Sequence, residues 1–276
     1  MSFPYTVGLA YGRDKKTSST KAHPLGTRGM TPDGRVFYYS QAGGPDLAAN
    51  VLVQAKATES QRTGANVALT PATSVGDWSG SNIPTGSASI GVVWVTAHAS
   101  AEFVDGYMTV ETTPGTGTYR IVGDSDTGSS NTVTVIRLHP QDTIQDAALT
   151  TVSKLALHQN PYASVVVAPT DLTNIVLGVP NVAVTSGEYF WCQTAGPGAV
   201  RYSSLVAAVV GEEIKGGIGA TAGNAAGSPR TTVITTEAIG STLNQLTYGS
   251  RPTIGYAMDG IPGNGDLLKV MFTIRG

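Results

Sequence analysis

The segment that closes the chain alternates strictly between apolar and polar residues. Its apolar positions are Leu268, Val270, Phe272 and Ile274, and Lys269, Thr273 and Arg275 lie among the positions between them. Successive side chains of a β-strand point to opposite faces, so this period of two predicts a strand with one buried face. A helix would scatter the same apolar side chains around its axis. The chain is therefore predicted to end in a half-buried β-strand.

Shorter segments with strand composition recur along the chain between Gly-rich and Pro-rich turns. They include residues 36–39, 51–57, 90–97, 104–110, 118–122, 132–138, 164–168, 188–194 and 205–210. Short strands at this spacing are typical of β-sandwiches and barrels. At most one short helix is expected, over residues 142–157, where Asp142 and Gln145 have capping-box spacing. Residues 152–157 fit a strand equally well. The predicted class is all-β, with β-sandwich or barrel modules and an extended N-terminal arm.

Changes in composition divide the chain into four predicted parts. Residues 1–30 lack an apolar period and are predicted to form an extended arm that builds no core of its own. Residues 31–140 form a β module with a long polar loop at 58–87. A connector at 141–160 leads to a C-terminal β domain at 161–276.

Charge is scarce and unevenly distributed. Charged residues make up 13% of the chain, about half of what is usual in globular proteins. The net charge is −2, which gives no general reason to expect binding to nucleic acid or to an anionic membrane. A surface so poor in charge is weakly protected against association. We therefore expect contacts with a partner or with further copies of the chain.

The N-terminal arm carries the one local concentration of positive charge. Five basic residues and a single Asp give residues 1–30 a net charge of +4, so the remainder carries −6. Aromatic side chains can anchor such a segment on another protein. The residues predicted to contact a partner are Phe3, Tyr5, Tyr11, Arg13, Lys15, Lys16 and Lys21.

Motifs that carry chemistry are weak or incomplete. His23, His98, His139 and His158 form no close pair of the kind that binds zinc. The stretch from Gly217 to Ala222 lacks the strand and helix context of a dinucleotide fingerprint. Asp124 and Asp126 lack the later glutamate of a calcium loop. We predict no catalytic, cofactor-binding or metal site, no cofactor, and a protein that is not an enzyme.

Cysteine and targeting signals add two expectations. Cys192 is the single cysteine, so no intrachain disulfide can form, and its apolar neighbours predict a buried thiol. The N-terminus lacks the pattern of a signal peptide. Synthesis in a cytoplasm is expected.

Three blocks of sequence resemble structural proteins of tailed bacteriophages. They are Thr31–Tyr39 continuing through Ala42–Ala49 to Val51–Gln54, Val182–Thr194 with Gly196–Val200, and Ile254–Gly260 with Gly265, Asp266 and the final strand. The last block is similar to the end of head decoration, or cement, domains. The resemblance implies a virion protein on the outer capsid surface, often a homotrimer, that clamps neighbouring subunits of the major capsid protein.

Two other functions remain open from the sequence. A tail-associated or fibre protein for host recognition would be equally rich in Gly, Thr and β-strands. A lectin or carbohydrate-active enzyme is a weaker alternative, because the three tryptophans do not lie near a cluster of acids.

Overall fold

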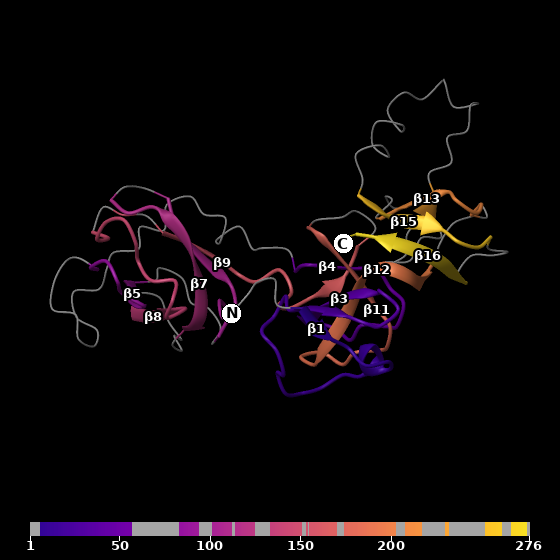
Figure 1. Cartoon of the computed structure of the whole chain (residues 1–276), viewed down its shortest axis with the longest axis horizontal. Coiled ribbons are helices and arrows are strands. Elements are labelled where there is room, and N and C mark those ends of the chain that lie inside the picture. The colour runs from indigo at the N-terminus through magenta and orange to yellow at the C-terminus, as the bar shows by residue number, and fades with distance from the viewer. Residues whose placement is uncertain are drawn as a thin grey trace, which may run out of the picture. The chain divides into compact units, whose positions relative to one another are not determined.

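The computed structural model describes most of the chain and confirms the all-β class (Figure 1). The described residues are 6–56, 83–93, 101–111, 114–124, 133–150, 153, 155–169, 174–202, 208–216, 230–231, 252–260 and 266–274. One helical turn, η1 (Arg13–Lys15), is the sole helix within these ranges. The chain forms two compact units, residues 1–57 with 161–276, and residues 58–160.

The first unit is built on a sheet of eleven strands. Along its main path the strands are β1 (Thr6–Gly8), β2 (Arg28–Met30), β3 (Val36–Gln41), β12 (Tyr189–Arg201), β16 (Leu267–Thr273), β15 (Thr253–Ala257), β13 (Glu213–Lys215) and β14 (Arg230–Thr231). A side branch contains β4 (Val53–Gln54), β10 (Val166–Val167) and β11 (Val176–Pro180). Only β1 and β2 pair in parallel; the other pairs described in this sheet are antiparallel.

Strand β12 is thirteen residues long and joins two hydrophobic cores of this unit. Its first half pairs with β3 and contributes Phe190, Trp191 and Cys192 to one core. Its second half pairs with β16 and contributes Val200 to the other. The register shifts between Gln193 and Ala195, as in a β-bulge, which bends a strand and strengthens its twist.

The final strand, β16, has the predicted alternation. Leu268, Val270 and Phe272 are buried, while the residues between them are exposed. Cys192 is fully buried, also as predicted. Local period and composition were sufficient for both predictions.

The second unit is a five-stranded antiparallel sheet around its own core. The strand order is β5 (Ser89–Val93), β8 (Val133–Leu138), β7 (Gly117–Asp124), β6 (Tyr107–Val110) and β9 (Leu155–His158). The segments predicted as strands at 104–110 and 118–122, which flank Gly115 and Gly117, pair as the hairpin of β6 and β7. No helix occurs in the described residues of 142–157; Asp142 instead accepts a hydrogen bond from the backbone N–H of Arg120, at 2.7 Å.

The division of the chain differs from the predicted one. Residues 31–57 belong with the C-terminal part, because β3 pairs with β12 from far along the sequence. The predicted connector, 141–160, is part of the second unit, where Ile144, Leu149 and Leu157 are buried in the core. The second unit is thus inserted between β4 and β10, which pair with each other. Of the predicted loop at 58–87, residues 58–82 lie outside the described ranges.

The predicted N-terminal arm is integrated into the first unit over its described residues. Leu9 and Leu25 are buried in the core. The His23 ring packs against Tyr39 and Trp191, with centroid distances of 5.3 and 5.5 Å. Strands of three residues with few apolar side chains carry no local signal. They are stable here because β3 and the aromatic cluster supply the surface on which they pack.

Gly178 in β11 lies where no side chain fits. Its φ is +148°, and a Cβ atom there would lie 2.3 Å from the Gln193 carbonyl oxygen and 2.8 Å from Cys192 Sγ. We expect Gly178→Ala to destabilise the first unit by more than 2 kcal/mol, an order-of-magnitude value for strain against backbone. Gly187→Ala is the matched control, because Gly187 also has positive φ (+84°) but open space around it. Thermal unfolding of both variants measures the difference; equal losses would contradict the steric argument.

Candidate interaction surfaces

Residues 10–16 form a tight turn, here called the basic turn, that presents positive charge to solvent. Its exposed side chains are those of Tyr11, Arg13, Lys15 and Lys16. Gly12 adopts φ +84°, and the backbone N–H of Lys16 bonds the Arg13 carbonyl at 3.3 Å. Tyr11 remains 64% exposed, which is unusual for so large an aromatic side chain. The turn therefore combines cations with an aromatic group free to contact a partner.

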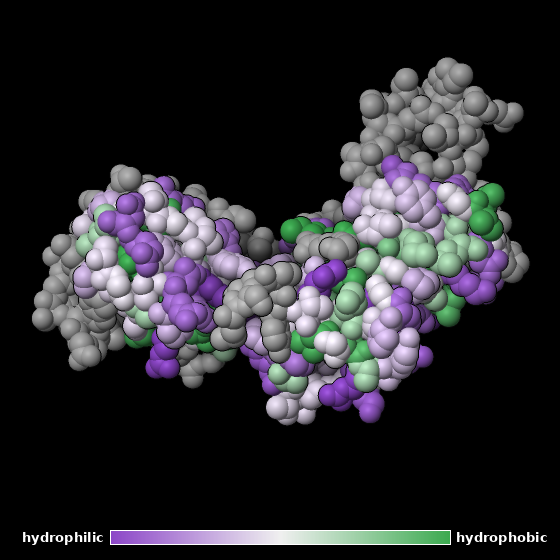
Figure 2. Space-filling view, viewed as in Figure 1, coloured by the Kyte–Doolittle hydropathy of each residue, from purple (hydrophilic) through white to green (hydrophobic). Residues whose placement is uncertain are grey.

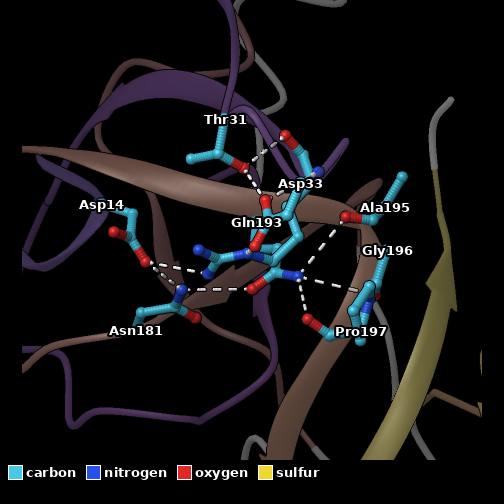
Figure 3. Close-up of polar contacts among 9 residues, drawn as sticks. Asp14, Thr31, Asp33, Asn181, Gln193, Ala195, Gly196 and Pro197 are labelled. Atoms are coloured by element: carbon cyan, nitrogen blue, oxygen red, sulfur yellow. Dashed lines mark hydrogen bonds and ion pairs between the residues drawn. The ribbon is translucent and has the colours of Figure 1, made fainter. Parts of the chain in front are cut away.

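Asp14 fixes this turn to the body of the first unit. Although its neighbours are exposed, Asp14 is only 1% exposed. Its Oδ2 accepts hydrogen bonds from Arg35 Nη1 at 3.1 Å and from Asn181 Nδ2 at 3.0 Å. Figure 3 shows the Asp14 and Asn181 side chains pointing toward one another. Its other oxygen, Oδ1, is buried without a hydrogen-bond partner among the described residues.

The contacts continue from Asn181 to the bulge in β12. Asn181 Nδ2 also donates to Gln193 Oε1 at 3.1 Å, and Gln193 is fully buried. Gln193 Nε2 in turn donates to the carbonyl oxygen of Pro197 at 2.9 Å, just past the bulge (Figure 3). One buried polar network thus connects three segments that are distant in sequence: Asp14, Arg35 and residues 181–197. It ties the basic turn to the strand that joins both cores.

Nearby charges and hydrogen bonds keep Arg35 and the adjoining Asp33 ionised. Arg35 Nε bonds Asp33 Oδ2 at 2.9 Å. Burial lowers the pKa of Arg35, but its bonds to Asp33 and the negative charges of Asp33 and Asp14 outweigh this and raise it. The pKa of Asp33 is lowered, first by the hydrogen bond from Thr31 and then, against desolvation, by Arg35. Both side chains are therefore charged at neutral pH.

The structure brings together four of the seven residues predicted to contact a partner. Tyr11, Arg13, Lys15 and Lys16 share the basic turn, and Lys21 is exposed further along the chain. Phe3 and Tyr5 lie outside the described residues. No sequence pattern indicated the role of Asp14, which was counted only as the single acid among the five bases of residues 1–30. Its burial depends on Arg35 and Asn181, and no local pattern connects them.

A second surface lies on the outer side of β15 and β16 and was not predicted. The apolar face, as we call it, consists of Tyr256, Met258, Leu267 and Met271, which are 47, 45, 52 and 39% exposed. In Figure 2 green residues, the hydrophobic ones, lie over this part of the first unit among white and purple ones. Met271 is the register partner of Tyr256. Exposed apolar side chains gathered in this way mark interaction sites more often than scattered ones do.

No three His, Cys, Asp or Glu side chains in the described part of the chain are placed to hold a metal ion. The described ranges contain no helix long and apolar enough to cross a membrane. Asp124 opens the weak calcium pattern at the end of β7, but the rest of that pattern, including Asp126, lies outside the described ranges, as does the stretch from Gly217 to Ala222.

Comparison of the chain with protein-family models, curated proteins and solved structures finds no match. Any function must therefore be argued from the two surfaces themselves.

Proposed function

We propose that the chain is a structural protein of a tailed-phage particle, a decoration protein that binds the outer surface of the head and stabilises contacts between major capsid subunits. The observation that carries the proposal is the basic turn. A buried carboxylate is costly unless charges and hydrogen bonds compensate it, and here that arrangement holds the backbone that carries four exposed side chains. Such anchoring suits a contact with a partner of opposite charge.

The chemistry of the turn indicates what the partner surface offers. Arg13, Lys15 and Lys16 would face carboxylates on the coat, and Tyr11 would pack into a shallow apolar depression. Because the turn is fixed before binding, little conformational entropy is lost on docking. The low overall charge and the resemblance of three sequence blocks to phage structural proteins support the same proposal.

Reversing charge on the turn tests the contact. We expect the double variant Lys15→Glu/Lys16→Glu to bind coat shells lacking this protein at least tenfold more weakly than wild type, about 1.4 kcal/mol or more. Binding is measured by co-sedimentation with the shells at two salt concentrations, since wild-type binding should weaken as salt rises. Lys56→Glu is the control, because Lys56 is exposed but lies outside the turn.

Two results would overturn the proposal. One is full occupancy of the shells by the double variant. The other is a copy number of a few to tens per particle, located on the tail, which would favour the tail-associated or fibre function instead. Hundreds of copies on the head are expected.

A further inference from the structure

Exposed apolar side chains are concentrated on one part of the first unit. Eleven large hydrophobic residues are exposed in the described ranges, and six lie at or beside the apolar face. Besides its four members these are Val209 and Val210, which are 67 and 65% exposed. They belong to the turn in which the Gly211 N–H bonds the Ala257 carbonyl at 2.8 Å. Together the six expose on the order of 500 Å² of apolar surface, at the upper end for a monomer's largest patch.

The strand registers show how this surface is bordered. Pro197, Met271, Tyr256 and Glu213 are successive register partners across β12, β16, β15 and β13. Arg201, the partner of Leu267, lies on β12 at the opposite border from Glu213. The apolar side chains thus lie between a basic residue on one side and an acidic residue on the other.

The charge within the face is already neutralised. Lys269 lies between Leu267 and Met271 on β16, and its Nζ bonds Asp259 Oδ2 at 2.9 Å. This hydrogen bond and the positive charge of Lys269 lower the pKa of Asp259, so both groups are ionised at neutral pH. A partner covering the face would meet no unpaired charge at its centre.

We propose that the apolar face binds the same face of a second copy of this chain, related to it by a two-fold axis. The two-fold axis lies in the plane of the interface and crosses the line from Arg201 to Glu213 at its midpoint, at a right angle. Rotation about this axis exchanges the two positions. Each Arg201 then meets the Glu213 of the other copy, and the contact is self-complementary, as a two-fold interface requires. If the four side chains of the face and the neighbouring Val209 and Val210 are covered on both copies, about 1,000 Å² of apolar surface is buried, the lower bound for a specific interface.

This pairing is separate from binding to the coat, because the basic turn is not among its residues. It also differs from the homotrimer that the phage resemblance implies. The other possible occupant of the face, a coat subunit, leaves the isolated protein monomeric, so the mass in solution distinguishes the two.

Sedimentation velocity of the full chain over a range of concentrations is the test. We expect a dimer for wild type and at least a hundredfold weaker association for Met271→Asp. Met30→Asp is the matched control, since Met30 is similarly exposed (43%) but lies on β2. A monomeric or trimeric wild type, or a dimer unaffected by Met271→Asp, would refute the pairing.

Charge exchange tests the predicted orientation. Arg201→Glu and Glu213→Lys are each expected to weaken the dimer about tenfold, and the double variant is expected to recover most of the loss. Glu213 also contacts Thr253 and Lys215 in its own chain, so thermal unfolding of each variant confirms that it folds. Additive losses in the double variant would exclude the Arg201–Glu213 contact. A wild-type protein that forms dimers but does not bind coat shells would instead contradict the coat-binding function alone.

Discussion

Phe272→Ala is expected to lower the free energy of unfolding of the first unit by about 3–5 kcal/mol. Phe272 is 1% exposed and packs in the core formed with Val200, Ile254 and Leu268. Removing the ring loses its hydrophobic burial and leaves a cavity. Strands β12 and β15 pair with β16 on its two sides and cannot move in to fill that cavity. Urea unfolding followed by tryptophan fluorescence gives the free energy.

Met271→Ala is the control from the adjacent position on the same strand. Met271 points to the opposite side of the sheet and is 39% exposed, so its truncation should cost about 1 kcal/mol or less in the isolated chain. Measurements at low protein concentration keep self-association from adding to the result. Equal losses for the two variants would contradict the register of β16.

Asp14→Ala should have the second large effect, a loss of about 3 kcal/mol. The substitution leaves the Arg35 guanidinium, itself largely buried at 16% side-chain exposure, without the carboxylate 3.1 Å away. It also removes the acceptor of one Asn181 hydrogen bond. Arg35 keeps its bond to Asp33 and Asn181 keeps its bond to Gln193, so the loss reflects the one acceptor that each donor loses.

Lys15→Ala tests whether the stability of the first unit depends on the charge of the basic turn rather than on its anchoring by Asp14. Lys15 is exposed next to Asp14, and its truncation should change stability by less than about 0.5 kcal/mol. Asp14→Ala should also weaken binding to coat shells, although every basic residue of the turn remains. If Asp14→Ala unfolds at the same urea concentration as Lys15→Ala, the network does not anchor the turn.

Sequence patterns predicted those elements whose information is local. The period of two in β16, the aromatic run in β12 and the hairpin of β6 and β7 are each visible within about ten residues. The cations of the basic turn were predicted only as partner contacts on an extended arm. Their gathering in one tight turn depends on the bonds of Asp14 to distant residues. The helix alternative at 142–157 failed for a similar reason: Asp142 has capping-box spacing, but its carboxylate bonds Arg120 on a neighbouring strand.

The sequence by itself determined the class of this protein, all-β, and the strands with strong alternation, since those depend on side chains a few positions apart. Only the tertiary structure decided that residues 6–8 and 28–30 join the sheet and that residues 58–160 are inserted into the first unit. It also decided that Asp14 meets Arg35 and Asn181, and that β15 and β16 expose an apolar face. These features depend on pairings such as that of Ala257 with Val270, 13 positions apart, and that of Asp14 with Asn181, 167 positions apart, for which a local pattern carries no signal. The final strand, β16, shows both contributions. Its alternation determines which of its side chains are buried, and its pairing with β15 places Tyr256 beside Met271 on the exposed side.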